Sequence, residues 1–211
     1  MTESLALRLR QETKQNHTEA ERSGIMRRLL TRTLDQPTYV ALLRNLLPVY
    51  EALEEEMTRH QDDAVVAPFH HPGLARSEAL RQDLDYLGGS GWRDLPVLPE
   101  TQAYVQQIHA AARRDPALLV AHAYVRYLGD LSGGQILKKI IAESFKLTGG
   151  EGVSFYEFPA LGDVDAFKHR YRAALDALAP PRERADSIVQ EAIGGFQANS
   201  RLFTGLETVS A

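Results

Sequence analysis

A stretch of glycines interrupts a helical pattern near the middle of the chain. Gly129, Gly133 and Gly134 lie in the sequence Gly-Asp-Leu-Ser-Gly-Gly-Gln at residues 129–135, and apolar side chains recur at spacings of three and four on both sides of it. Each glycine costs a helix interior about 1 kcal/mol relative to alanine. Glycines at such a place allow either two helices to pack closely or a ligand to approach the backbone. The pattern alone leaves both alternatives open.

The same stretch resembles two nucleotide-binding motifs, and we reject both. Leu131–Gln135 matches the signature peptide of ATP-binding-cassette ATPases, and Gly129–Gly134 has the glycine spacing of a phosphate-binding loop. That loop requires a lysine for the phosphates and a hydroxyl for the metal ion, but residues 135 and 136 are Gln and Ile. We therefore expect no nucleotide site.

Composition places the chain among ordinary globular proteins. Its 211 residues, 44% hydrophobic and 25% charged, predict one domain spanning residues 1–211. The net charge of -4 argues against a nucleic-acid partner. The absence of cysteine excludes disulfides, thiolate metal sites and a cysteine nucleophile. The sequence shows no signal peptide and no apolar run of roughly 18 residues, so we expect a cytoplasmic monomer without a membrane anchor.

Hydrophobic periodicity predicts an all-α fold of about seven or eight helices. The expected helices begin near residues 3, 37, 77, 100, 116, 163 and 181, and the expected loops span residues 61–73, 88–99 and 149–162. Asp35 and Asp163 are expected to cap helices. Glu54–Glu56 is expected to lie on a solvated face.

A histidine lies on the apolar stripe of the first predicted helix, residues 3–22. This position predicts that the imidazole of His17 is buried, and such a histidine is more often a core residue than a ligand. Glu21, one turn later, could accept a hydrogen bond from the second ring nitrogen. Arg10 and Lys14, within two turns before it on an adjoining face, could meet an anionic ligand.

Two later helices carry further candidates. Lys168 and Arg172 are four residues apart, so they form either a solvated flank or a pair that binds carboxylates or phosphates. Asn199 shares an apolar stripe with Phe196 on the last predicted helix. If Asn199 is buried, its amide requires hydrogen-bond partners.

Taken together, these residues resemble the heme oxygenases that produce biliverdin. The most specific part is residues 121–135, Ala-His-Ala-Tyr-Val-Arg-Tyr-Leu-Gly-Asp-Leu-Ser-Gly-Gly-Gln, which is close to a family signature. Glu12–Glu21, Ala52–Glu56 and Phe167–Arg172 support it. The likeness therefore covers nearly the whole chain, and it implies the multi-helix fold of that family with a glycine-kinked distal helix.

The resemblance implies a heme site. His17 would be the proximal ligand of the heme iron, with Glu21 bonded to its other nitrogen, and the three glycines would bring the distal helix backbone over the heme face. The residues implied to contact the heme or to hold its propionates are Arg10, Tyr124, Lys168, Arg172 and Phe196. Arg10 stands where lysine is common in the family, which keeps the charge but changes the geometry.

The resemblance also implies a reaction in which heme b is both substrate and cofactor. Asp130 would hold a water that delivers a proton during oxygen activation. The outer members of its network would be Tyr50, Tyr104, Arg126 and Asn199. The reaction would use O2 and electrons from a ferredoxin, a flavodoxin or a flavoprotein reductase. Because Lys168 and Arg172 are both present, we expect attack at the α-meso carbon, giving biliverdin IXα, CO and ferrous iron.

Other functions are compatible with parts of this pattern. A heme-binding carrier or sensor on the same fold would need His17 and the propionate contacts, but it would not need Asp130. A thiaminase-like relative would need a catalytic cysteine, which this chain lacks. The residues that could form a basic docking face for a redox partner are Lys14, Lys138, Lys139, Lys168 and Arg170.

Overall fold

The computed structural model describes residues 4–209, and within this range the chain is helical and contains no β-strand. The α-helices are α1 Leu5–Glu12, α2 Lys14–Arg22, α3 Gly24–Leu30, α4 Gln36–Arg59, α5 Ser77–Gly88, α6 Pro99–Arg114, α7 Leu119–Ala123, α8 Gly129–Ser144, α9 Val164–Ala177 and α10 Arg182–Val209. The predicted all-α class is confirmed. The predicted number of seven or eight helices is too low for this range, because two expected helices are divided and α3 was not expected at all.

The first division occurs at Thr13, inside the helix expected over residues 3–22. The backbone of Thr13 leaves helical geometry at φ -95° and ψ 0°, and its hydroxyl donates to the carbonyl of Leu9 at 2.6 Å. A threonine bonded back to the preceding turn bends a helix. Consequently α1 and α2 are separate helices.

Gly24 separates α2 from α3. The first predicted helix ends at residue 22, and α2 does end at Arg22, but α3 begins at Gly24, only two residues later. Its φ is +46°, and a Cβ at this position would lie 2.0 Å from the carbonyl oxygen of Phe203 in α10. Glycine is therefore required here by conformation and by the close approach of another main chain.

The predicted helix caps are found where acidic side chains were expected. Asp35 accepts a hydrogen bond from the main-chain nitrogen of Thr38 at 2.8 Å, and Asp163 accepts one from Ala166 at 2.9 Å. Each satisfies one free N–H at a helix start.

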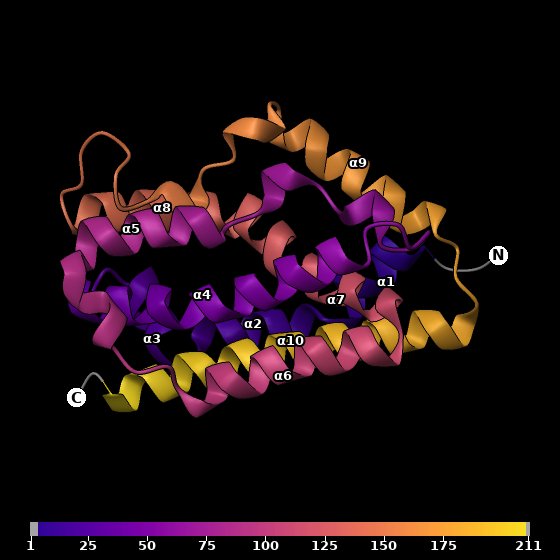
Figure 1. The fold of residues 1–211 in the computed structure, drawn as a ribbon, viewed down its shortest axis with the longest axis horizontal. Coiled ribbons are helices and arrows are strands. Elements are labelled where there is room, and N and C mark those ends of the chain that lie inside the picture. Colours follow the sequence, from indigo (N-terminus) through magenta and orange to yellow (C-terminus); the bar gives the residue numbers. More distant parts are fainter. Residues whose placement is uncertain (1–3, 210–211) are drawn as a thin grey trace.

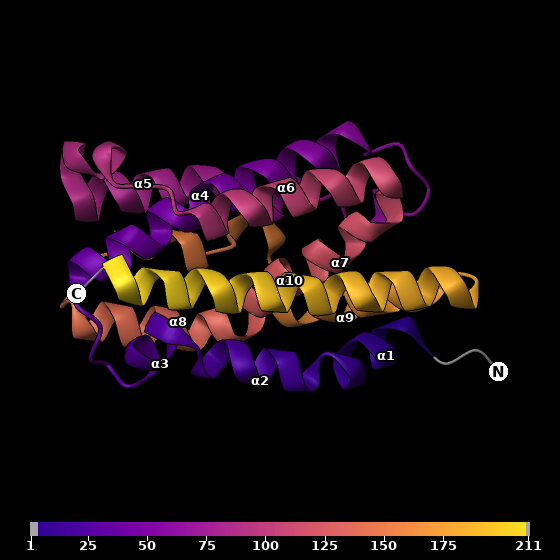
Figure 2. The same cartoon turned by 90° about the horizontal axis from the view of Figure 1, so that it is seen from below.

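The long helices pack around one shared core. α4 packs against α5 and α6, while α10 lies along α6 on one side and along α2 and α3 on the other. Figure 1 shows α9 crossing the opposite end of the molecule from α3, and Figure 2 shows α1, α2 and α3 following one another along one edge. Among the largest fully buried side chains are Tyr39, Tyr50 and Tyr104. The buried side chains of these helices form one continuous cluster.

The central helix is irregular one turn before its glycines. A 3-10 turn at Pro116–Leu118 leads into α7, and one π-helical turn, Tyr124–Leu128, joins α7 to α8. Gly129 itself has ordinary helical angles, φ -62° and ψ -51°. The sequence placed the irregularity at the glycines, whereas the structure places it just before them. Such π turns occur frequently at functional sites.

The connection between α8 and α9 contains two short turns, Ser154–Tyr156 and Pro159–Leu161, as expected for a loop. It passes between α5 and α8 and packs against both of them. None of the helices within residues 4–209 is long and apolar enough to cross a membrane.

Candidate functional site

The first turns of α8 have a face that is bare of side chains, because Gly129 and Gly133 lie on it. Gly129 and Gly133 are exposed, and a Cβ added to either would meet no atom within 4 Å. Ile136, one turn later on the same face, is 61% exposed. The alternative that these two glycines allow close helix packing is therefore wrong, and the open face is compatible with the approach of a ligand.

Gly134 has a different role from the other two glycines. A Cβ at this position would lie 3.0 Å from the ring of Tyr156, so the glycine lets the loop after α8 pack closely against the helix. Gly134 therefore belongs to the packing behind the bare face.

A buried hydrogen-bond network lies beside this face. The hydroxyl of Tyr50 donates to the carboxylate of Asp130 and accepts two hydrogen bonds from the guanidinium of Arg126, at 2.9 and 2.7 Å. Arg126 also donates to the amide oxygen of Asn199 at 2.7 Å, and the Asn199 nitrogen donates to the carbonyl of Gly195 at 3.1 Å. The structure thus brings four predicted residues together and supplies the partners that Asn199 requires.

The network places a carboxyl group with a pKa near neutrality beside the bare face. Burial raises the pKa of Asp130 to about 6, although the charge of Arg126 and the hydrogen bond from Tyr50 oppose this rise. Burial also raises the pKa of Tyr50 well above 10, while Tyr50 and Asp130 keep Arg126 charged by raising its pKa. Asp130 can therefore gain or lose a proton near neutral pH, as a general acid must.

Tyr104 lies at the edge of this network. Its hydroxyl is buried next to Asn199 and Arg126, and burial raises its pKa to about 12. The hydroxyl makes no hydrogen bond to a described residue, and its ring packs 5.8 Å from that of His122. The structure therefore brings Tyr104 next to the predicted network without bonding it to Asp130.

The imidazole of His17 is exposed, so the prediction that it is buried is wrong. Its side chain and that of Glu21 are each 53% exposed, and Nδ1 of His17 lies 3.7 Å from a carboxylate oxygen of Glu21. The ring of His17 packs edge-on against Phe196, at 5.7 Å between centroids. The apolar stripe of α1 and α2 ends in an open position, because Leu9, Thr13 and Ala20 are buried and His17 is not.

A small basic cluster lies near the junction of α1, α9 and the π turn. Burial raises the pKa of Tyr124, and the charges of Arg10 and Arg172 oppose that rise, so the three groups are close in space. Within the described residues, neither arginine has an ion-pair partner. Lys168 lies 2.7 Å from Asp165, so this predicted residue already has an acidic partner.

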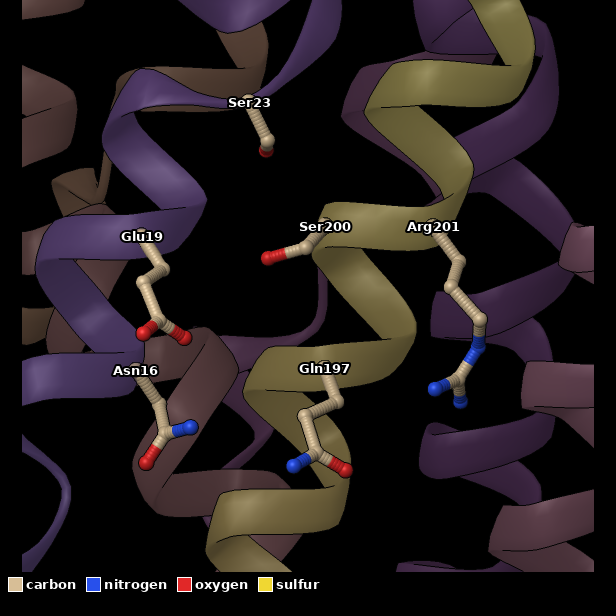
Figure 3. A pocket seen from close by; sticks show the side chains of 6 residues that line it. All are labelled: Asn16, Glu19, Ser23, Gln197, Ser200 and Arg201. Atoms are coloured by element: carbon tan, nitrogen blue, oxygen red, sulfur yellow. The ribbon is translucent and has the colours of Figure 1, made fainter.

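A separate hollow lies between α2 and α10. Figure 3 shows it, and its volume is about 300 Å³. The residues that line it are Asn16, Glu19, Ser23, Gln197, Ser200 and Arg201. Asn16 immediately precedes His17 in the sequence, and Gln197 immediately follows Phe196. Neither His17 nor Phe196 lines the hollow. It is distinct from the bare face of α8.

Comparison with known proteins identifies the family. The family model described as heme oxygenase matches residues 3–205. Heme oxygenase 1 of Nostoc sp. is 42% identical over 208 residues, which cover 98% of this chain and 87% of the relative. The chain belongs to the heme oxygenase family.

Solved structures of heme oxygenases have the same fold. A crystal structure of heme oxygenase-1 from Synechocystis sp. PCC6803 in complex with heme has a TM-score of 0.93 and 41% identity, covering 98% of this chain and 94% of the other. A heme oxygenase structure from Leptospira interrogans has a TM-score of 0.92 and 41% identity, covering 96% of this chain and all of the other. The family resemblance and the multi-helix fold expected from it are confirmed.

The sequence did not indicate how this heme oxygenase supports α8. Phe155 and Tyr156 lie in the loop after α8, yet the ring of Phe155 packs 5.3 Å from that of Tyr50 and Tyr156 packs against α8. The signal that could have found them is a pair of aromatic residues within a glycine-rich loop, which is typical of a loop that packs against a core. Glu54 and Glu56 were expected on a solvated face, but Glu56 is buried and Glu54 is half-buried against α5.

Proposed function

We propose that the chain acts as one heme oxygenase domain that binds heme between α2 and α8 and converts it to biliverdin IXα, CO and ferrous iron. The observation that carries this proposal is the bare face at Gly129 and Gly133, with the buried carboxyl of Asp130 directly beside it. A flat ligand can contact the α8 backbone there, and a proton donor with a pKa of about 6 is within the same helical turn.

The other residues present fit heme. His17 offers an exposed imidazole, and with Nδ1 facing Glu21, Nε2 is the nitrogen available to bind iron. Phe196 packs against the side of that imidazole and restricts its orientation. Arg10 and Arg172, which form no ion pair within residues 4–209, match the two carboxylates of the heme propionates.

Asp130 is proposed to govern proton delivery. Heme, when bound, supplies the iron at which O2 is reduced and the ring carbon that is oxidised. Tyr50 holds the Asp130 carboxyl in one orientation, and Arg126 holds Tyr50 through two hydrogen bonds. A carboxyl fixed in this way can orient a water on the open face and pass a proton through it.

The basic cluster is proposed to set the reaction at the α-meso carbon. Arg10, Tyr124 and Arg172 would fix the propionates and hence the rotation of the heme in its plane. Lys168 can join them by exchanging Asp165 for a propionate, since Asp165 is 83% exposed and remains hydrated without it.

Electrons are proposed to come from a ferredoxin, a flavodoxin or a flavoprotein reductase in the cytoplasm, with the chain acting as a monomer. The basic residues proposed to face this partner are Lys14, Lys138, Lys139, Lys168 and Arg170. Lys138 is 2.7 Å from Glu157 and Lys168 is paired with Asp165, so the three cations that form no ion pair with a described residue carry most of the expected attraction.

Spectroscopy with hemin tests the proposal. Purified protein is mixed with hemin, a reducing system is added under air, and the Soret band is followed together with the red absorbance of a bilin in the presence of catalase. Loss of the Soret band with growth of bilin is the expected result. The Asp130→Ala variant should bind hemin normally and form little biliverdin.

A heme carrier or sensor is the second candidate, because His17 and the basic cluster alone would suffice for binding. Tight binding with an intact Soret band under several electron donors would support the carrier and contradict the enzyme. An unchanged biliverdin yield in Asp130→Ala would contradict the role of Asp130 while leaving the enzyme intact.

A further inference from the structure

Two charged side chains at α5 are buried without an opposite charge bonded to them. Arg76, the residue before the helix, is 6% exposed, and Asp83, within the helix, is 0% exposed. Neither side chain forms an ion pair with any residue in the range 4–209. Burying a charge without a counter-charge is costly, so the groups that do bond to them are informative.

Both side chains bind the main chain of the same segment, residues 153–157 in the loop after α8. Asp83 accepts hydrogen bonds from the main-chain nitrogens of Ser154 and Phe155, each at 2.8 Å. Arg76 donates to the carbonyls of Phe155, at 3.4 Å, and Glu157. The main chain of Phe155 is thus held at its N–H by an anion and at its C=O by a cation.

The guanidinium of Arg76 is fixed by further contacts. It donates to the carbonyl of Leu74 at 3.1 Å and to that of Gly73 at 3.1 Å, and it lies 4.0 Å from the ring centroid of Phe158. A planar guanidinium with this many partners has one orientation, which a lysine ammonium cannot reproduce.

The start of α5 is also attached to α4. A carboxylate oxygen of Glu54 accepts hydrogen bonds from the main-chain nitrogens of Arg76, at 2.6 Å, and Ser77, at 3.0 Å. Glu54 therefore caps α5 from a neighbouring helix. The position of Arg76 is set by α4, the helix that also carries Tyr50.

Segment 153–157 contacts the distal network on its other side. The ring of Phe155 packs edge-on against Tyr50, at 5.3 Å between centroids. The ring of Tyr156 fills the space at Gly134, and its carbonyl accepts a hydrogen bond from the side chain of Gln135 at 2.8 Å. The segment therefore lies between α5 on one side and Tyr50 and α8 on the other.

We propose that Arg76 and Asp83 are positioning residues for Asp130, because they hold segment 153–157 in the place from which it supports Tyr50 and α8. This inference rests on the proposed function, which gives Asp130 its task. Neither residue touches the bare face of α8. Each acts through the segment, and Arg76 also acts through its charge.

The charge of Arg76 lowers the pKa of Asp130, against the larger effect of burial. The other titratable or charged groups that face Asp130 from the elements packed around it are Arg126, Tyr50, Tyr104, Tyr127 and Tyr156. Among these, Arg126 is the second cation, and the tyrosines stay neutral at physiological pH because burial raises their pKa values. Removing the charge of Arg76 should therefore raise the pKa of Asp130 further.

The first test is the carboxyl 13C titration of Asp130 in the heme-free protein. In Arg76→Gln we expect the midpoint to rise by about half a pH unit or more. In Arg76→Lys the charge is retained, so the midpoint should stay near that of the wild type while the carboxyl chemical shift still changes with the altered geometry. Arg44→Gln is the matched control, because Arg44 also donates to a main-chain carbonyl, that of Leu95, and stacks on an aromatic ring, Trp92.

The second test compares heme binding with product formation. We expect Arg76→Lys and Asp83→Asn to bind hemin within about twofold of the wild-type affinity, a change of less than about 0.5 kcal/mol, but to form less biliverdin per heme consumed. Arg44→Gln should change neither quantity. A purely structural role would lower binding and yield together.

Two results would overturn the inference. One is an Asp130 titration and chemical shift that are the same in folded Arg76→Gln or Arg76→Lys as in the wild type. The other is a fall in heme affinity that accounts for the whole loss of product. If the wild-type protein forms no biliverdin at all, the proposed function fails, whereas the titration of Asp130 still tests the positioning by Arg76.

Discussion

Replacing Asp130 with asparagine should change how the stability of the heme-free protein depends on pH. Relative to the wild type, the variant should be more stable at neutral pH than it is at acid pH. The pKa of Asp130 is about 6 in the folded protein and 3.8 in the unfolded chain. Because the folded state holds this proton more tightly, ionisation of Asp130 destabilises the fold as pH rises. The difference corresponds to about 3 kcal/mol, at 1.36 kcal/mol per pH unit, lost between about pH 4 and pH 6.

The Asp130→Asn variant lacks this loss, since its amide can still accept the hydrogen bond from Tyr50 at every pH. Urea unfolding of both proteins from pH 4 to pH 7 should show the variant gaining about 3 kcal/mol relative to the wild type over that range. Any constant difference between the two proteins, from an altered contact with Arg126, does not affect this slope.

Asp35→Asn is the control for the same chemical change. The pKa of Asp35 is lowered, chiefly by its hydrogen bond from the main chain of Thr38, so its ionisation stabilises the fold and that stability is lost as pH falls. The control variant should therefore lose stability relative to the wild type as pH rises, which is the opposite sign, but mostly below the unfolded pKa of 3.8. From pH 4 to pH 7 its difference from the wild type should be nearly constant. A flat difference between Asp130→Asn and wild type across this pH range would refute the desolvated carboxyl on which the proton-delivery proposal depends.

Four further substitutions separate ligand-facing positions from packed ones. Gly133→Ala should leave the heme-free protein as stable or about 1 kcal/mol more stable, because its side chain meets open space, but it should weaken hemin binding in a Soret titration. Gly134→Ala should not give this gain in thermal melts, since its Cβ would crowd Tyr156 at 3.0 Å. His17→Ala should abolish the histidine-ligated heme spectrum with less than about 0.5 kcal/mol change in urea unfolding, because the side chain is exposed. Gly24→Ala should cost about 2 to 4 kcal/mol in the same unfolding assay, because the residue has φ +46° and touches the main chain of α10; a melting curve like the wild type would contradict this.

The sequence predicted the fold well where local signals and tertiary packing agree. Asp35 and Asp163 mark helix starts because an acidic side chain after a loop can bond the first free N–H groups, and both do so. The division at Thr13 escaped prediction because threonine is tolerated within helices, and only its bond back to Leu9 shows the bend.

The site could be predicted only in part, because helical periodicity does not distinguish a core from a ligand surface. His17 follows the same spacing as Leu9 and Thr13, so the sequence predicted that all three are buried. In the structure His17 is exposed, whereas Leu9 and Thr13 are buried. The supporting contacts of Arg76 and Asp83 were beyond sequence reasoning, because both bind the main chain of a segment about 70 to 80 residues away.

The two sides of the proposed heme site differ in how far their groups are already bonded to one another without the ligand. On the distal side, Asp130, Tyr50 and Arg126 are already bonded to one another in the interior, so the geometry for proton delivery does not have to form when heme binds. On the proposed proximal side, His17 is exposed and Arg10 forms no ion pair with a described residue, so the further contacts of these groups come from the ligand. The free energy of heme binding should therefore come mainly from α1, α2 and α9. The distal side should contribute interactions that are made chiefly during the reaction. This division favours turnover of the substrate over tight binding of it.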